Sequence, residues 1–237
     1  AKDLGFQGIE VRGLGDELFD GKTKPFQQEN LPKTLAQLKK IRMNISCISS
    51  GACLKFPEKA EETRRELLRS IDVASQLEAP FVRILGDLSP APDGEVEALI
   101  PYAEEKGVTL LVETNGVYAD TSRLAGLLNQ IESDSIGALW DMHHPYRYGN
   151  ETPEQTVQNL GAYIKYTHIK DSVMENGRVA YKMMGEGDLP VDAIMRALRS
   201  INYEGYISLE WLKSYMPELN DAGVVFPQFT HFMSQYL

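Results

Sequence analysis

The sequence predicts an α/β protein and, within that class, a (β/α)8 TIM barrel formed by one domain that spans residues 1–237. Two observations support this prediction. Short apolar runs alternate with longer amphipathic segments, which is typical of parallel strands joined by helices. Ionisable residues also stand at the ends of four consecutive runs, where a barrel of this kind carries its active site. The chain length fits a single barrel.

The strand candidates are short runs rich in Val, Ile, Leu and Phe. They lack the strict alternation of a half-exposed strand, as expected for a parallel sheet that is covered on both faces. Successive runs are about one strand–helix unit apart. In chain order, the predicted strands are 8–12, 44–49, 81–85, 109–113, 138–141, 166–169 and 206–210.

The segments between these runs carry apolar residues at helical spacing, and several carry signals that start or stop a helix. Thr121 precedes Leu124, Leu127 and Leu128, as in a capped amphipathic helix. Gly107 follows three charged residues and is typical of a glycine that ends a helix. The predicted helices are 32–42, 58–77, 94–106, 121–132, 153–160, 191–200 and 226–236.

Two architectures share this alternation, an open doubly wound sheet and a closed barrel of eight strands. No glycine-rich phosphate loop follows any of the runs, which weakens the nucleotide-binding forms of the open sheet. The barrel needs one more strand–helix unit than the sequence shows. Residues 1–5 resemble the tail of a helix that ends at Gly5, so we expect a first strand to be missing from this chain.

Composition and charge restrict the function classes. Hydrophobic residues make up 43% of the chain and charged residues 24%, and two cysteines are too few for a disulfide scaffold. The chain has 24 Lys and Arg against 34 Asp and Glu, a net charge of −10, and no basic run, so we expect no nucleic-acid partner. Neither a transmembrane stretch nor a signal peptide is visible. We therefore expect a cytoplasmic protein without membrane association.

Four consecutive predicted strands carry, at or near their ends, a side chain that can bind a metal. These side chains are Glu113, Asp141, His168 and Glu210. Because the carboxyl ends of the strands meet at one mouth of a barrel, we expect the four to converge on one point. A glutamate at the end of one strand is more often solvated or paired than a metal ligand. The repetition over four strands is hard to obtain by accident, and it predicts a metal site.

Three carboxylates and one imidazole form a donor set dominated by hard oxygen atoms. Such a set favours one divalent ion, Mn²⁺ or Mg²⁺ first and Co²⁺ or Zn²⁺ next. An octahedral ion with four protein ligands keeps about two positions for substrate oxygens. The ion then acts as a Lewis acid that stabilises an enediolate, while Glu113 or Glu210 removes the proton next to the carbonyl.

Five further residues are candidates for substrate contacts, and each has a structural alternative. His144 stands three residues after the strand-end aspartate and faces the same mouth, or it is an ordinary loop histidine. Lys170 contacts substrate or supports a ligand, or it is a loop charge. Arg83 and Glu10 reach substrate hydroxyls or pair with other charges. Glu186 lies in a glycine-rich loop that either covers the site or is a turn before the next helix.

Taken together with the motifs that contain them, these residues make the sequence resemble the xylose isomerase-like TIM-barrel superfamily of sugar phosphate isomerases and epimerases. Its members include ketose 3-epimerases, hydroxypyruvate isomerase, inosose dehydratase and 3-dehydroshikimate dehydratase, with endonuclease IV as a distant relative. The resemblance covers essentially the whole chain and is specific for the superfamily rather than for one activity. The matching motifs are LGFQGIEVR (4–12), LLVETN (110–115), WDMHHPY (140–146), YTHIKDS (166–172), GEGDLP (185–190) and GYISLEW (205–211).

The resemblance implies roles for individual residues. The four metal ligands of the family match Glu113, Asp141, His168 and Glu210. In the epimerases, the residues that match the two glutamates also face the substrate as an acid–base pair. His144 matches a histidine that contacts a substrate oxygen, and Glu186 falls in a loop that often closes near the site. The motif at 4–12 normally belongs to the second of eight strands, which again implies a missing first strand.

We therefore expect a divalent-metal-dependent isomerase or epimerase of a small sugar or sugar derivative. A dehydratase of an inosose or a dehydroshikimate-like keto-polyol uses the same intermediate, and the sequence does not separate the two. An endonuclease IV-like enzyme needs three zinc ions and many histidines, whereas this chain has four histidines. Intact ligand positions argue against a non-catalytic barrel. The sugar, its phosphorylation and the oligomeric state, including a homo-oligomer, stay open.

Overall fold

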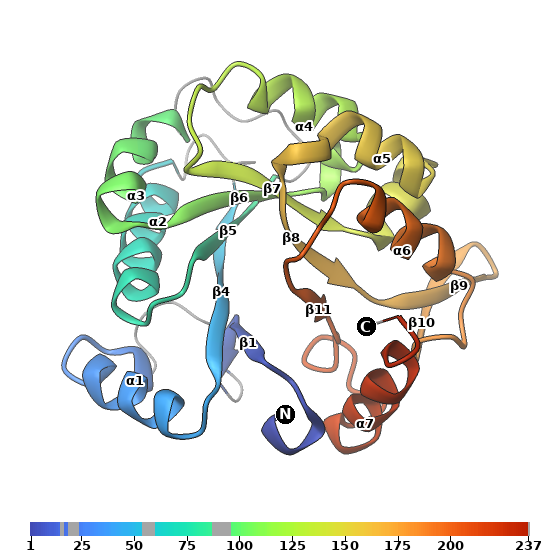
Figure 1. Ribbon diagram of the computed structural model, residues 1–237, viewed down its shortest axis with the longest axis horizontal. Helices are drawn as coiled ribbons and strands as arrows, with labels where there is room; N and C mark the ends of the chain where they lie inside the picture. The colour runs from blue at the N-terminus through green and yellow to red at the C-terminus, as the bar shows by residue number, and fades with distance from the viewer. Residues whose placement is uncertain (15–16, 19–23, 54–59, 87–95, 237) are drawn as a thin grey trace.

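The computed structural model describes residues 1–14, 17–18, 24–53, 60–86 and 96–236. Its centre is a sheet of seven strands in which every neighbouring pair is parallel. The strands curve around a central axis and the helices lie outside them, which confirms the predicted TIM-barrel class (Figure 1). The strand order is β1 (Gly8–Val11), β4 (Asn44–Cys53), β5 (Phe81–Leu85), β6 (Thr109–Glu113), β7 (Ile136–Asp141), β8 (Ile164–Ile169) and β11 (Ile207–Leu209).

A helix follows each strand of the sheet along the chain, as in repeated strand–helix units. Short 3₁₀ turns and one π-helical turn, η6 (Pro145–Gly149), supplement them. The α-helices are α1 (Leu31–Lys40), α2 (Ala60–Gln76), α3 (Ile100–Lys106), α4 (Thr121–Leu128), α5 (Pro153–Leu160), α6 (Val191–Ser200) and α7 (Ala222–Met233).

Side chains along the strands alternate between the outside and the inside of the barrel. Outward-facing residues such as Leu110, Val112 and Ala138 belong to the main core. A second, smaller apolar cluster is formed by the inward-facing residues Cys47, Leu111, Leu139 and Tyr166. Two residues further along these four strands, the inward positions are polar. The barrel interior therefore has an apolar layer below and a polar layer at the carboxyl ends of the strands.

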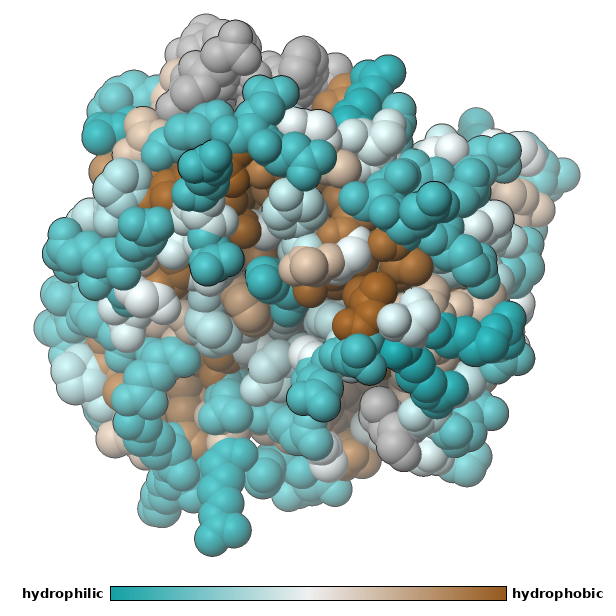
Figure 2. Space-filling model, turned by 45° about the horizontal axis from the view of Figure 1, so that its top comes forward, coloured by the Kyte–Doolittle hydropathy of each residue, from teal (hydrophilic) through white to brown (hydrophobic). Residues whose placement is uncertain are grey.

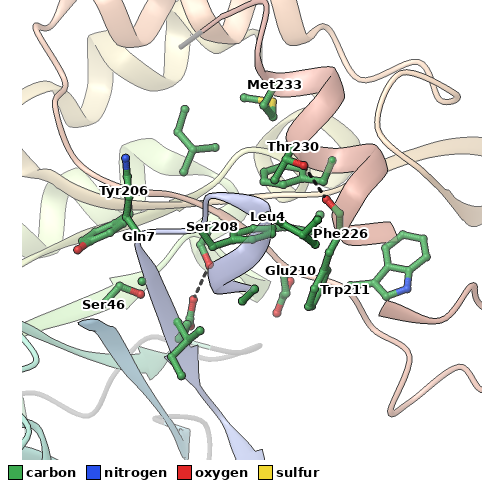
Figure 3. A pocket seen from close by; sticks show the side chains of 18 of the residues that line it. Leu4, Gln7, Ser46, Tyr206, Ser208, Glu210, Trp211, Phe226, Thr230 and Met233 are labelled. Carbon is green, nitrogen blue, oxygen red and sulfur yellow. Dashed lines mark hydrogen bonds between the residues drawn. The ribbon is translucent and has the colours of Figure 1, made fainter. Parts of the chain in front are cut away.

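Strands β1 and β11, at the two ends of the strand order, are not paired with each other in the described part of the chain. A cavity of about 1080 Å³ lies along this seam. Tyr206, Ser208 and Glu210 line the cavity on the β11 side, and Phe226 and Met233 of α7 lie across from them (Figure 3). Seven strands are consistent with the expectation that a first strand is missing from this chain.

The turn η1 (Lys2–Leu4) ends at Gly5, as the sequence predicts. The φ of Gly5 is +87°, in the left-handed region that glycine enters without a steric penalty. The ring of Phe6 then packs against two rings of α7, with centroids 5.4 Å from Phe226 and 5.9 Å from Phe229. Aromatic contacts thus hold the first and last elements of the chain together.

The predicted elements agree with the structure most closely in the middle of the chain. The predictions 81–85, 109–113, 153–160 and 191–200 match β5, β6, α5 and α6. The last predicted strand, 206–210, is shorter, so Glu210 follows β11 rather than ending it. The predicted helix 121–132 ends at Leu128, because the chain tightens into a turn closed by the bond from Gln130 N to Leu127 O. Residues 58–59 and 94–95 of two predicted helices lie outside the described residues.

The structure contains an antiparallel hairpin that the sequence analysis did not predict. Strand β9 (Asp171–Glu175) pairs with β10 (Arg178–Lys182) directly after β8. The two residues between them, Asn176 and Gly177, have φ values of +51° and +75°. Asn-Gly with two positive φ angles is the signal of a two-residue hairpin turn. The Asn-Gly dipeptide was therefore the sequence signal from which this hairpin could have been predicted.

The visible surface is mostly hydrophilic. On the face in Figure 2, hydrophobic side chains appear in separate areas between hydrophilic ones, not as one continuous patch. Within the described ranges, no helix has the length and the apolar character needed to cross a bilayer.

Candidate metal centre

The polar layer at the carboxyl ends of the strands contains a compact group of potential metal ligands. One ligand atom from each of four residues lies within 4.8 Å of the other three. Three of the residues are buried and the fourth is partly buried. They are Glu113, Asp141, His168 and Glu210, the four that the sequence predicts to converge. Their roles as ligands remain a prediction.

Strand register explains why these residues meet. Asp141 on β7 is aligned with His168 on β8, so their side chains leave the sheet next to each other. His168 is in turn aligned with Ser208 on β11, and Glu210 is the next inward position after Ser208. Glu113 is the last residue of β6, beside β7. Parallel alignment and a period of two therefore turn four distant residues toward one centre.

Glu113 forms a buried ion pair with Arg83 on β5. Arg83 Nη1 lies 2.6 Å from Glu113 Oε2, and both side chains are 1% exposed. Burial, the largest single influence, raises the pKa of Glu113, but Arg83, His168 and His144 together outweigh burial and hold that pKa well below its usual range. The other oxygen, Oε1, lies 3.8 Å from His168 Nδ1. One oxygen of Glu113 is thus held by Arg83, while the other faces the cluster.

Asp141 is oriented by the backbone that follows it. Its Oδ1 accepts hydrogen bonds from His143 N at 2.9 Å and from His144 N at 3.3 Å. Its own N–H donates to Thr114 Oγ1 at 2.9 Å. Oδ2 points the other way and contacts the ammonium of Lys170. These bonds leave Oδ2 as the oxygen that Asp141 offers to the centre.

Lys170 lies between two of the candidate ligands. Its ammonium contacts both Asp141 Oδ2 and Glu210 Oε2, and its side chain is buried. Burial, the largest single influence, lowers the pKa of Lys170, but the carboxylates of Asp141, Glu210 and Glu113 together outweigh burial and raise it. Lys170 is therefore protonated at neutral pH. A metal ion bound here would compete with the Lys170 ammonium for the same carboxylate oxygens.

Glu210 also has a partner across the seam. Arg12 Nη1 lies 3.4 Å from Glu210 Oε1, in addition to the contact between Lys170 and Oε2. Burial, the largest single influence, raises the pKa of Glu210, but the positive charges of Lys170 and His168 and the hydrogen bond from Lys170 together outweigh it, so the pKa falls to about 2. Glu210 and Glu113 are thus both deprotonated at neutral pH.

The two ring nitrogens of His168 differ in their contacts. Nε2 lies 2.7 Å from Glu10 Oε2. Nδ1 is buried and has no hydrogen-bond partner among the described residues. Burial, the largest single influence, lowers the pKa of His168, but the carboxylates of Glu10, Glu113 and Glu210 together outweigh it and raise that pKa well above the usual value. Nδ1 is therefore the donor atom that faces the carboxylates.

These residues fit a divalent metal ion. His168 supplies a buried nitrogen without a partner, and Glu113, Asp141 and Glu210 each turn one oxygen toward it. Oxygen donors with one imidazole suit Mg²⁺ or Mn²⁺, and the same number of ligands also suits Zn²⁺. The observation that supports a metal here is the unpartnered Nδ1, because buried polar atoms in proteins are nearly always hydrogen-bonded.

The other predicted site residues lie at different distances from the cluster. His144 Nε2 is 3.4 Å from Asp141 Oδ2 and 4.0 Å from Glu113 Oε1. Its ring stacks on Tyr148 of the π-helical turn, with centroids 5.5 Å apart. Burial lowers the pKa of His144, which keeps the ring neutral. His144, Lys170, Arg83 and Glu10 all face the cluster.

Glu186 is the exception. Its side chain is exposed and makes no hydrogen bond or ion pair with the cluster in the described structure. Its loop is held by Asp171, whose buried carboxylate accepts four backbone hydrogen bonds. The donors are Ser172 N, Gly185 N, Gly187 N and Leu189 N. The structure thus places the loop beside β9, and the predicted substrate contact of Glu186 stays a prediction.

Three polar residues of the inner layer were not identified from the sequence. Ser49 and Ser208 donate hydrogen bonds to Glu10, and Thr114 binds the backbone of Asp141. Ser49 stands two residues after the inward-facing Cys47, and Ser208 stands two residues before the inward-facing Glu210. Counting in steps of two from each inward residue was therefore the signal that points to them.

The fold and the site define a class of protein, and comparison with known sequences supports it. Residues 1–224 match the sequence model of the xylose isomerase-like TIM barrel family, so the chain belongs to that family. A fructoselysine 3-epimerase from Shigella flexneri is 26% identical over 239 residues, which cover 92% of this chain and 85% of the relative.

Solved structures share the fold at low sequence identity. A xylose isomerase domain protein from Planctomyces limnophilus has a TM-score of 0.81 at 17% identity, covering 99% of this chain and 89% of the other. The IOLI protein with a bound zinc atom has a TM-score of 0.79 at 16% identity, with 100% and 91% covered. A probable 3-DHS dehydratase, AsbF, from Bacillus anthracis has a TM-score of 0.76 at 19% identity, with 98% and 90% covered.

Proposed function

We propose that this chain is a divalent-metal-dependent isomerase or epimerase of a small sugar or sugar derivative. One observation carries the proposal: three carboxylate oxygens and the unpartnered Nδ1 of His168 lie within 4.8 Å of one another at the catalytic end of a TIM barrel. The similarity to a fructoselysine 3-epimerase supports a sugar as substrate. When bound, a divalent cation supplies Lewis-acid polarisation of a substrate carbonyl.

Glu113 and Glu210 are the proposed acid–base pair. Both are deprotonated at neutral pH because Arg83 and Lys170 stabilise their charged forms, so either can accept a proton from the carbon next to a carbonyl. Return of that proton to the neighbouring carbon gives an isomerisation. Epimerisation requires the other glutamate first to take up a proton from solvent and then to deliver it to the opposite face of the same carbon.

Other residues of the inner layer orient the groups that react. His144 lies 3.4 Å from Asp141 Oδ2 and its side chain is 14% exposed, so its neutral ring can hydrogen-bond a substrate hydroxyl. Arg83 holds one oxygen of Glu113 and so directs the other toward the centre. Lys170 places a positive charge beside Asp141 and Glu210, which favours negative charge developing on the substrate.

The test is NMR spectroscopy in D₂O on protein stripped with a chelator and then supplied with Mn²⁺, or with Mg²⁺ where paramagnetic broadening hides signals. The panel contains free ketoses, their phosphates, keto-inositols and fructoselysine. We expect deuterium next to a carbonyl without loss of water, and the labelled carbon separates isomerase from epimerase. Loss of water instead shows the alternative, a dehydratase. Absence of exchange on the whole panel, with metal bound, contradicts the proposed reaction for these substrates.

Replacement of one glutamate provides the matching variant test. We predict that Glu210→Gln lowers turnover by a factor of about 10² to 10⁴, because an amide accepts no proton from carbon. Glu104→Gln on α3 is the control, because Glu104 is exposed and its partner is Ser133, outside the site. Activity of Glu210→Gln near that of the control overturns the mechanism.

A further inference from the structure

Glu10 reaches the metal cluster from the opposite edge of the sheet. It lies on β1, at one end of the strand order, whereas His168 lies on β8, near the other end. Glu10 Oε2 and His168 Nε2 are 2.7 Å apart, and the Glu10 side chain is 13% exposed. This contact spans the seam between β1 and β11, where the two strands are not paired.

The Glu10 carboxylate is itself held in place by two serines. Ser49 Oγ on β4 donates to Glu10 Oε1, and Ser208 Oγ on β11 donates to Oε2 at 3.1 Å. Together with His168, these donors come from three different strands. Each carboxylate oxygen thus has a fixed partner, and the carboxylate has one orientation toward the imidazole. Figure 3 shows Ser208 hydrogen-bonded at the wall of the seam cavity.

The contacts of His168 determine which nitrogen is available to a metal. A neutral imidazole that donates through Nε2 carries its lone pair on Nδ1. Nδ1 is the buried atom without a partner, and it lies 3.8 Å from Glu113 Oε1. Metal-binding histidines commonly donate their other N–H to a carboxylate, which fixes both the tautomer and the orientation of the ring.

We propose that Glu10 is a positioning residue of the metal centre, which holds the His168 ring so that Nδ1 faces Glu113, Asp141 and Glu210. This inference rests on the proposed function, because it assumes the same four-ligand metal site. In this role Glu10 acts through His168 and does not itself contact the metal. The assignment differs from the sequence-based expectation that Glu10 contacts substrate.

The first experiment measures Zn²⁺ affinity by competition with a chromophoric chelator, on protein stripped of metal. We expect Glu10→Ala to weaken binding by a factor of about 10 to 100, the usual effect of losing such a hydrogen-bond partner. Glu10→Gln keeps an acceptor oxygen but not the charge, so its affinity lies between those of Glu10→Ala and the wild type. Ser208→Ala removes one support of Glu10 and has a smaller effect. Glu104→Gln is the control and leaves the affinity unchanged.

The second experiment reports on the histidine itself. In ¹⁵N NMR spectra of the Zn²⁺-loaded wild type, we expect a His168 signal with Nδ1 bound to metal and with an Nε2–H proton protected from exchange. In Glu10→Ala, the same proton exchanges rapidly with water. A merely structural role for Glu10 changes the thermal midpoint but neither the tautomer nor the exchange of this proton.

The outcomes separate this inference from the proposed function. If the wild type binds no Zn²⁺, or binds it without a shift of the His168 nitrogens, the metal site itself is wrong. If the wild type binds Zn²⁺ through His168 and folded Glu10→Ala binds it equally well, the metal site stands and the positioning role of Glu10 is refuted. If Glu10→Ala does not fold, the comparison of Glu10→Gln with Ser208→Ala decides by the same criterion.

Discussion

At the scale of single residues, the candidate centre is a set of paired charges. Glu113 is paired with Arg83, Glu210 with Lys170, and Glu10 with His168. Burying a lone carboxylate costs several kcal/mol, so each buried acid needs a partner in the absence of metal. This pairing balances the charge of each buried acid, and binding of a metal ion at Nδ1 would displace a proton from His168.

The paired charges predict how stability depends on pH when metal is removed. The pKa of Glu113 is lowered from 4.5 in the folded protein, so its contribution is complete above about pH 4.5 and is lost as the pH falls. The pKa of His168 is raised from 6.5, so its contribution is complete below about pH 6.5 and is lost as the pH rises through the folded value. As far as these groups determine it, the thermal midpoint in EDTA is highest between those two values.

A series of thermal melts in EDTA, from about pH 3 to about pH 9, checks this prediction. The control is His168→Gln, which cannot be protonated in this range and loses the decline on the alkaline side. A wild-type midpoint that rises steadily through neutral pH in EDTA contradicts the raised pKa of His168.

At the scale of elements, the sequence predicts where a strand or helix lies better than it predicts the residues at which that element begins and ends. Buried strands such as β5 and β6 are continuous apolar runs bounded by polar residues, so their ends are visible in the sequence. The four candidate ligands were predictable for the same reason, because each stands one strand–helix unit after the last. The contact between Glu10 and His168 was not predictable. It depends on how far the sheet curves, which brings β1 close to β8 although they are 158 residues apart at this contact.

Two glycines give a matched test of packing between elements. A Cβ on Gly149, at the end of the π-helical turn η6, would lie 2.3 Å from the backbone oxygen of Ala119. We expect Gly149→Ala to destabilise the protein by about 1–3 kcal/mol, because a backbone atom cannot move aside as a side chain does. Gly126 lies inside α4 with nothing within 4 Å of its Cβ position, so Gly126→Ala should stabilise by about 0.5–1 kcal/mol. Urea unfolding of the two variants measures both effects, and equal changes contradict the geometry.

At the scale of the whole molecule, the middle strands of the sheet are held by more burial and strand pairing than the two strands at its ends. Strand β7 is buried along its whole length and pairs with β6 and β8, whereas β1 and β11 each pair on one side. Among the described residues, side chains rather than backbone hydrogen bonds join the two ends, through Glu10 with Ser208 and Arg12 with Glu210. The cytoplasmic location and the oligomeric state concern this scale as well: the first stays a prediction, and the second stays open.

Hydrogen exchange tests this distribution of stability. We expect the amides of β6 and β7 to exchange only on global unfolding, and those of β1 and β11 to exchange through local opening at least about ten times faster. Native-state exchange followed by mass spectrometry of peptides resolves the four strands. Equal protection of all four means that the two edges are joined by backbone hydrogen bonds in solution.

The loop that contains Glu186 depends on the carboxylate of Asp171 for several of its backbone hydrogen bonds. Four backbone N–H groups depend on this one side chain, two on each oxygen. Rotation of the carboxylate removes the acceptor of all four N–H groups together, three of them in the loop and one, that of Ser172, on β9. A change at Asp171 therefore loosens the loop in one step but does not release it, because the bond from Asp188 N to Ser172 O and the ion pair of Arg147 with Asp188 remain.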